Sequence, residues 1–257
     1  MTQAAGNGPP RDARKLWRRP TTNAPAPEPE TRSGWSLMRD VVTIILTALV
    51  ASLLIKTFLV QPFVIPSGSM ESTLHGCPTC PNGDRVLVNK RTRQMGGVQR
   101  GDVVVFRDNY GWLSSHPEAP GLQTRLHDAL AFVGLVPTTS ESHLVKRVIG
   151  VGGDTVEARD GKVYVNGLLL NEPYVFAGDR SSEVGFRVTV PADRLWVMGD
   201  HRSESGDSRF HQQGPGKGFV RVQDVVGRAF AIIWPLDRMG SLERPKTFAR
   251  SFATAGH

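Results

Sequence analysis

Two serines that flank a glycine, Ser67 and Ser69, directly follow the most apolar stretch of this sequence. A lysine, Lys146, lies much later in the chain, inside the apolar run at 144–150. Burial of a lysine disfavours its ammonium form and lowers its pKa, so the neutral amine can accept a proton near neutral pH. Such an amine can activate a serine hydroxyl without a histidine. The pair predicts nucleophilic chemistry in which Ser69 attacks and Lys146 removes its proton.

Each of these features also has a plain structural interpretation. A Ser-Gly-Ser sequence after Pro66 is common in turns. Lys146 and Arg147 are neighbours and project to opposite faces of a strand, so we expect one of the two cations to face the interior. An edge strand that carries charge to prevent aggregation would look the same. The segment 199–209, dense in hydroxyls, glycines and acids, is either a polar loop or a network that orients the lysine and neutralises Arg147.

The apolar segment 35–60 decides where this chemistry would take place. Its uncharged run, 41–55, is short for a membrane span, but Lys56 can direct its amine outward and the residues after it extend the segment. A secretory signal peptide and a buried core helix are the alternatives. The leader is long for a signal peptide, and few polar positions mark a solvent face. We therefore predict a transmembrane anchor at 35–60.

The residues before the anchor are rich in Pro, Gly, Thr and charge, which predicts a disordered tail at 1–34. Much of the formal charge of +7 comes from its first nineteen residues. Such a basic cluster binds nucleic acid or lies beside anionic lipid, and the apolar segment that follows favours lipid. The positive-inside rule then predicts a cytoplasmic tail and an extracytoplasmic domain at 61–257.

Short strand patterns dominate the chain from residue 82 onward, separated by Gly-Asp, Asp-Gly and Asn-Gly turns. Asn166-Gly167 is a strong two-residue hairpin turn. We expect a mainly β domain that is interrupted by an insert at 107–143. Within the insert, 125–136 has the pattern of a short helix, which either packs on the β core or rests on the bilayer.

The sequence has two cysteines, Cys77 and Cys80, so no disulfide framework supports the fold. They can form a small disulfide, remain free thiols or, with His75, form an incomplete metal site, and we rank these in that order. We expect no metal and no cofactor. The seven histidines are scattered, and none belongs to a nucleophile motif.

Three motifs in order resemble those of bacterial type I signal peptidases, the serine–lysine peptidases of family S26. They are PSGSM at 66–70, KRV at 146–148 and GDHRSESGDSR at 199–209. The resemblance covers about 35–234, and the HGCPTC segment with the long insert is similar to actinobacterial members. It implies an antiparallel β-sheet catalytic domain, preceded by one N-terminal transmembrane helix and carrying a partly helical insert.

The resemblance also implies roles for individual residues. Ser69 matches the nucleophile and Lys146 the general base, while Ser67 and the Ser69 N–H match the oxyanion hole. The supporting residues are Ser205, which matches a serine that hydrogen-bonds the lysine amine, and the charged pairs Asp200 with Arg147 and Asp207 with Arg209. The sequence departs from the family pattern at Ser72, where proline is usual, and at His201, where asparagine is usual.

The implied function is removal of N-terminal signal peptides from exported preproteins, after small residues of the Ala-x-Ala type, through an acyl-enzyme. We expect a monomer at the plasma membrane that binds the lipid bilayer and no nucleic acid. Alternatives are a membrane-tethered serine–lysine peptidase of other specificity and a non-catalytic β domain that binds an extracellular partner. Self-cleavage near Ser67 is a secondary possibility, because small residues follow an apolar segment.

Overall fold

The structure is a computed structural model that describes residues 34–76, 83–93, 97–113 and 143–250. The predicted tail at 1–34, the cysteine pair Cys77 and Cys80, and the predicted helix at 125–136 fall outside these residues, apart from the last position of the tail.

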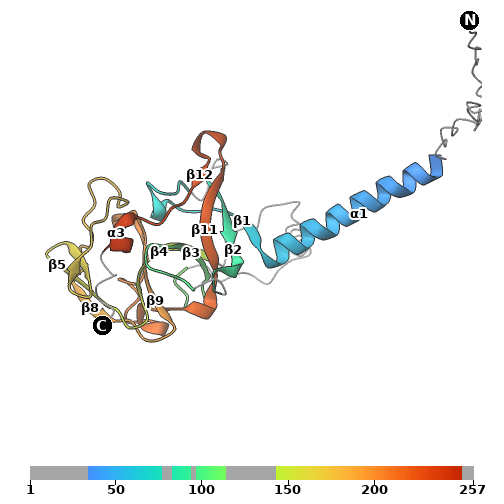
Figure 1. The fold of residues 1–257 in the computed structure, drawn as a ribbon. Coiled ribbons are helices and arrows are strands. Elements are labelled where there is room, and N and C mark those ends of the chain that lie inside the picture. The colour runs from blue at the N-terminus through green and yellow to red at the C-terminus, as the bar shows by residue number, and fades with distance from the viewer. Residues whose placement is uncertain (1–33, 77–82, 94–96, 114–142, 251–257) are drawn as a thin grey trace, which may run out of the picture. The chain divides into compact units, whose positions relative to one another are not determined.

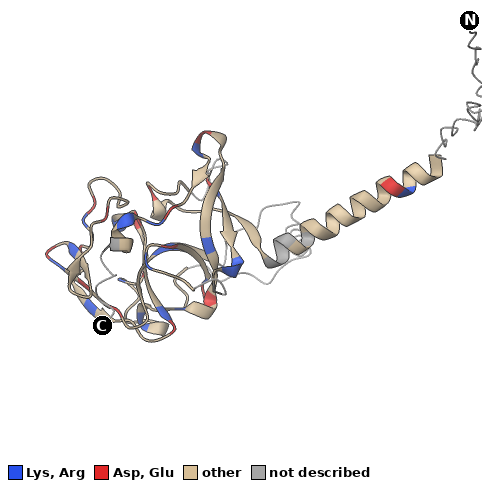
Figure 2. Cartoon of the chain, viewed as in Figure 1, with Lys and Arg blue, Asp and Glu red and all other residues tan. Residues whose placement is uncertain are grey.

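Helix α1 covers Gly34–Phe58. Apart from Arg39 and Asp40 near its beginning, Figure 2 shows an uncharged stretch along its described residues. Those of its apolar side chains that the structure describes are exposed, with Ile44 at 66%. By length and composition, the part Gly34–Ser52 can cross a membrane, and it is the one such helix among the described residues.

A larger antiparallel sheet carries the centre of the β domain (Figure 1). Its eight strands follow the order β1-β2-β11-β3-β4-β9-β10, with β12 paired to β11. These strands are β1 (Val60–Val64), β2 (Arg85–Asn89), β3 (Val103–Arg107), β4 (His143–Val151), β9 (Arg194–Met198), β10 (Val220–Arg221), β11 (Val225–Trp234) and β12 (Gly240–Ser241). Strand β1 lies at the sheet edge, where Pro62 is tolerated because its missing N–H breaks no internal ladder.

A smaller antiparallel sheet has the order β7-β6-β5-β8. Its strands are β5 (Thr155–Arg159), β6 (Lys162–Val165), β7 (Leu168–Leu169) and β8 (Phe186–Thr189). Asn166 and Gly167 both have positive φ, 53° and 81°, so they form the predicted hairpin turn between β6 and β7. In Figure 1 this sheet lies at the opposite end of the domain from β1 and β2.

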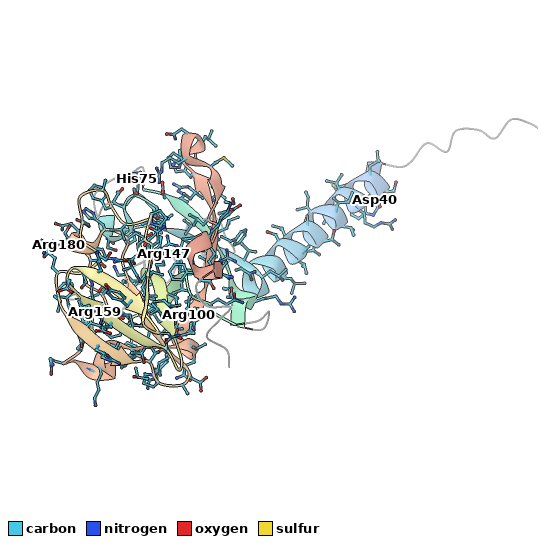
Figure 3. The ribbon with its side chains drawn as sticks, turned by 60° about the vertical axis from the view of Figure 1, so that its left-hand side comes forward. Asp40, His75, Arg100, Arg147, Arg159 and Arg180 are labelled. Carbon is cyan, nitrogen blue, oxygen red and sulfur yellow. The ribbon has the colours of Figure 1, made fainter. Side chains whose placement is uncertain are left out.

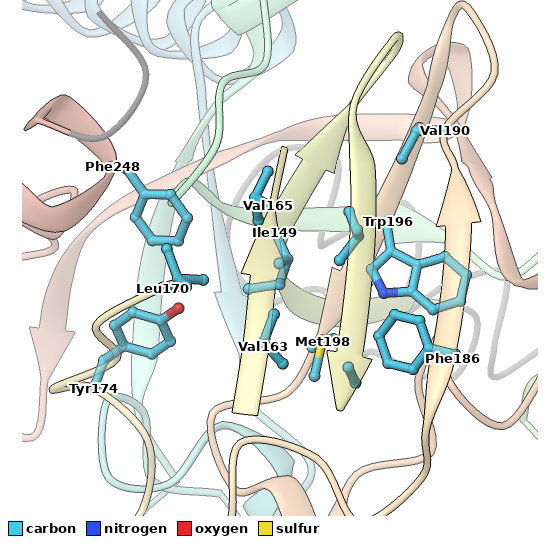
Figure 4. Packing of buried hydrophobic residues seen from close by; sticks show 12 residues of the cluster. Ile149, Val163, Val165, Leu170, Tyr174, Phe186, Val190, Trp196, Met198 and Phe248 are labelled. Carbon is cyan, nitrogen blue, oxygen red and sulfur yellow. The ribbon is translucent and has the colours of Figure 1, made fainter. Parts of the chain in front are cut away.

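Apolar side chains from both sheets meet around Trp196, which is fully buried (Figure 4). Phe186 of β8 packs against its ring, with 5.0 Å between the ring centroids. The last helix, α3 (Lys246–Arg250), inserts Phe248 into the same cluster. A second cluster contains Phe63 and Ile65 from the segment that leads to Ser69. The predicted fold class, a mainly antiparallel β domain after one N-terminal apolar helix, is confirmed.

Candidate active site

The serine motif forms a short loop directly after β1. Residues Gly68–Met70 make one turn of 3-10 helix. This turn directs Ser69 into the domain, where the residue is only 6% exposed. Met70 and Leu74, which follow Ser69, are fully buried, so the loop is fixed by apolar packing on the same core as β1. The nucleophile candidate therefore sits on a rigid turn.

Lys146 reaches this loop from β4, a central strand that pairs with β3 and β9. Its Nζ atom lies 2.6 Å from Ser69 Oγ, and the residue is 2% exposed. Burial lowers the pKa of Lys146 to about 8, although the Asp207 carboxylate opposes this change. A substantial fraction of the amine is therefore neutral near pH 8, and it can accept the Ser69 proton.

Ser67 lies beside the nucleophile on the exposed side of the loop. Its Oγ atom is 3.2 Å from Ser69 Oγ. A hydroxyl in this position and the backbone N–H of Ser69 are two donors of the kind that stabilise an oxyanion.

Arg147, the neighbour of Lys146, is also buried, at 2% exposure. The prediction that one of the two cations would face the interior is wrong, since both do. Asp200 makes this possible, because its two oxygens accept hydrogen bonds from Arg147 Nε and Nη2 at 2.8 and 2.6 Å. Figure 3 shows Arg147 within the body of the domain, and its guanidinium also lies 4.3 Å from the ring centre of Tyr174.

Asp207 is the acceptor at the centre of a second buried network. Arg209 donates to it from Nε and Nη2, both at 2.8 Å, and the Gly199 N–H donates at 3.0 Å. Burial raises the pKa of the Asp207 carboxyl, but the hydrogen bonds from Arg209 outweigh it, so the pKa lies below its usual range. Asp207 is therefore ionised at neutral pH, and its charge acts on Lys146.

Ser205 hydrogen-bonds to a different partner in the Asp207 network from the one that the resemblance implies. The resemblance implies a hydrogen bond to the lysine amine, whereas Ser205 Oγ donates to Asp207 Oδ2 at 2.8 Å. An ionised, buried carboxylate is a stronger acceptor than an amine, which accounts for the difference. Ser205 thus fixes the carboxylate whose charge acts on Lys146.

Three further residues at this site were missed by the sequence analysis. Thr73 Oγ1 donates to Asp200 at 2.6 Å and ties the serine loop to the Arg147–Asp200 pair. Arg202 pairs with the buried Glu172 and donates to the Gly199 carbonyl at 2.9 Å. Arg202 lies inside the motif at 199–209 and Thr73 lies close to the motif at 66–70, but Glu172 has no sequence signal.

Two sequence departures lie close to the nucleophile. The peptide bond between Glu71 and Ser72 is cis, at the position where proline is usual. His201 donates its backbone N–H to the Ser69 carbonyl at 3.2 Å, and its ring stacks on Phe176 with 4.2 Å between centroids. The contact with Ser69 therefore uses no atom of the His201 side chain. Within the described ranges, no group of three His, Cys, Asp or Glu residues could hold a metal ion.

Most of this chain matches one family of known proteins. The model of the family described as signal peptidase, peptidase S26, matches residues 38–234. The chain belongs to this signal peptidase family. Signal peptidase I of Mycobacterium tuberculosis is 42% identical over 236 residues, which cover 83% of this chain and 77% of that protein.

More distant signal peptidases give the same result. The probable signal peptidase I of Mycobacterium leprae is 40% identical over 211 residues, covering 72% of each chain. The probable signal peptidase I-2 of Synechocystis is 34% identical over 196 residues, covering 76% of this chain and 73% of that protein. The prediction of an actinobacterial-type signal peptidase is thereby confirmed, and with it the prediction of an enzyme.

Proposed function

We propose that this chain is a membrane-anchored endopeptidase that removes signal peptides from exported preproteins with a Ser69–Lys146 dyad. The observation that carries the proposal is the contact of 2.6 Å between Lys146 Nζ and Ser69 Oγ, made inside the domain by a lysine whose pKa is lowered by burial. A binding domain has no need of a partly neutral buried lysine beside a serine. This arrangement therefore favours an enzyme over the non-catalytic alternative.

In the first step, neutral Lys146 accepts the Ser69 proton while Ser69 Oγ attacks the scissile carbonyl carbon. The carbonyl oxygen becomes an oxyanion, which the Ser69 N–H and the Ser67 hydroxyl stabilise. Lys146, now protonated, gives its proton to the leaving amine of the mature protein. The signal peptide remains attached to Ser69 as an ester.

In the second step, Lys146 removes a proton from a water molecule, which attacks the ester carbonyl. The signal peptide leaves with a new carboxylate, and Ser69 recovers its proton from Lys146. Asp207, held by Ser205 and Arg209, stabilises the ammonium form of Lys146 between these transfers. The Arg147–Asp200 pair fixes the strand that carries the base.

Helix α1 supports the membrane part of the proposal, because Gly34–Ser52 is long and apolar enough to cross a bilayer. With basic residues before it, the tail would be cytoplasmic and residues 61–257 extracytoplasmic. The substrate cleavage site would then reach Ser69 as the preprotein emerges. Small residues at positions −1 and −3 are the proposed specificity.

Cleavage of a purified preprotein with an Ala-x-Ala site tests the proposal. The full-length protein in detergent or vesicles should release the mature protein with the expected N-terminus. Ser69→Ala and Lys146→Ala should each abolish cleavage while leaving the fold intact. Wild-type rates from either variant would refute the dyad, and cleavage at other sites would refute the specificity.

A further inference from the structure

A further ion pair lies at the base of the serine loop, in addition to the two networks around Lys146 and Arg147. Asp84 precedes β2 and is completely buried. Its carboxylate accepts hydrogen bonds from Arg238 Nε and Nη2, both at 3.0 Å. Arg238 belongs to the 3-10 turn Leu236–Arg238, which follows β11 more than 150 residues later in the chain.

Asp84 holds both ends of the segment that contains Ser69. On the entry side, its carbonyl accepts a hydrogen bond from the Ile65 N–H at 2.9 Å. On the exit side, its N–H donates to the His75 carbonyl at 2.8 Å, and its carboxylate accepts the His75 N–H at 2.9 Å. One residue thus closes the loop 65–75 at its base.

The backbones at this base approach so closely that larger residues would not fit. A Cβ atom on Gly76 would lie 2.6 Å from the Ile65 carbonyl oxygen and 2.8 Å from that of Ser67. A Cβ atom on Gly83 would lie 2.9 Å from the Ile65 carbonyl oxygen. The loop is therefore closed tightly by its own main chain, and Asp84 completes the closure.

Arg238 supports the closure in two ways. Its positive charge compensates the negative charge of the fully buried Asp84 carboxylate, which would be costly to bury without a partner. Its Nη2 atom also lies 3.4 Å from the Thr73 carbonyl, inside the loop itself. Thr73 in turn donates to Asp200, so hydrogen bonds connect Arg238 through Thr73 to the Arg147–Asp200 pair.

We propose that Asp84 and Arg238 form a clamp that holds Ser69 at its attack distance from Lys146, which makes Arg238 a positioning residue for acylation. The inference rests on the proposed function of the dyad. Small misplacements of a nucleophile reduce rates strongly even when the substrate still binds. Loss of Arg238 should therefore lower the acylation rate and kcat with little change in KM.

The test is the rate of Ser69 acylation by a serine-directed acylating inhibitor, together with kcat and KM for an Ala-x-Ala peptide, in the full-length protein. Arg238→Ala should slow acylation by about 10- to 100-fold. Arg238→Lys should recover part of this loss, because a single ammonium still reaches the carboxylate but cannot form the two-point contact. The double variant Asp84→Asn/Arg238→Ala should be no slower than the slower single variant.

Arg221→Ala is the matched control. Like Arg238, Arg221 pairs with an aspartate, and its Nε lies 2.8 Å from Asp224 Oδ2. The two arginine side chains are similarly exposed, at 38% for Arg221 and 28% for Arg238. The acylation rate of the Arg221→Ala variant should stay within about twofold of the wild-type rate. The pH dependence of acylation should be unchanged in Arg238→Ala, since the charged groups that act on Lys146 are Asp207, Arg209 and Asp200, and this variant keeps all three.

The possible results separate the clamp from the proposed function. If wild type is acylated at Ser69 and Arg238→Ala reacts at the same rate, or slows no more than Arg221→Ala, the clamp is wrong. If wild type is not acylated at Ser69, the proposed function itself fails. Should Arg238→Ala not fold, Arg238→Lys and Asp84→Asn decide: slower acylation by folded protein supports the clamp, and wild-type rates contradict it.

Discussion

Arg147 and Asp200 form a two-point ion pair in the interior of the domain, with Nε–Oδ1 and Nη2–Oδ2 distances of 2.8 and 2.6 Å. The pair joins β4, which carries Lys146, to the loop that follows β9. Thr73 adds the serine loop to the same carboxylate. Three segments that are distant in sequence are thus fixed to one another around the Ser69–Lys146 contact.

Asp200→Ala should destabilise the protein strongly, because it leaves the Arg147 guanidinium buried without its partner. We expect the free energy of unfolding to fall by about 3–5 kcal/mol. Glu157→Gln is the control, since Glu157 pairs at 3.5 Å with two exposed arginines and should cost less than about 1 kcal/mol. Denaturant unfolding of both variants measures this. Equal, small losses would contradict the structural role of the Arg147–Asp200 pair.

The activity should depend on the protonation of Lys146. Its pKa is lowered from 10.5 to about 8 by burial, so kcat/KM should rise as the pH rises through about 8 and then level off. Asp207→Asn should move this rise to lower pH, because the Asp207 carboxylate raises the pKa of Lys146. A rise that stays at the same pH in Asp207→Asn would show that another group is titrating.

The same pKa difference has a consequence for stability. In the unfolded chain Lys146 regains a pKa near 10.5, so between pH 8 and 10.5 the unfolded state binds more protons than the folded state. The contribution of Lys146 to stability should therefore improve as the pH rises through this window. Lys146→Met should lack this improvement, and a difference in stability between wild type and Lys146→Met that does not change with pH would contradict it.

Ser67→Ala should remove one oxyanion donor and its hydrogen bond to Ser69 Oγ, while the contact of 2.6 Å between Ser69 Oγ and Lys146 Nζ remains. Loss of such a donor typically lowers kcat by about 10²–10³-fold with little change in KM. Ser67→Thr keeps the hydroxyl and should retain most of the activity. Steady-state kinetics on an Ala-x-Ala peptide decide, and a Ser67→Ala enzyme that loses affinity but not kcat would assign Ser67 to substrate binding instead.

Much of the β architecture could be predicted from local patterns. The short strand patterns and the Gly-Asp and Asp-Gly turns expected from residue 82 onward correspond to strands β2, β3, β5 and β6, each of which follows such a turn. Strand β1 was missed, because Pro62 and its place after the apolar segment hide a short edge strand. Phe248 gave no signal either, since one phenylalanine in a polar, basic stretch enters the core only through tertiary packing.

The candidate site could be predicted where chemistry restricts the residue type. Ser69, Lys146 and the two aspartate–arginine pairs were found from motifs, and the structure brings them together. The burial of both Lys146 and Arg147 could not be predicted from the alternation along the strand, because it depends on Asp200, which compensates the Arg147 charge in the interior. The same applies to the Asp84–Arg238 pair, whose partners are separated by 154 positions.

The central claim, that Ser69 is the nucleophile and Lys146 its base, is tested most directly by trapping the acyl-enzyme. The full-length protein is incubated with a serine-directed acylating inhibitor, and the modified peptide is identified by mass spectrometry. We predict one adduct on Ser69 in wild type, none in Ser69→Ala, and a reaction in Lys146→Ala too slow to detect over the same time. An adduct on another serine, or equal labelling of Lys146→Ala, would contradict the account.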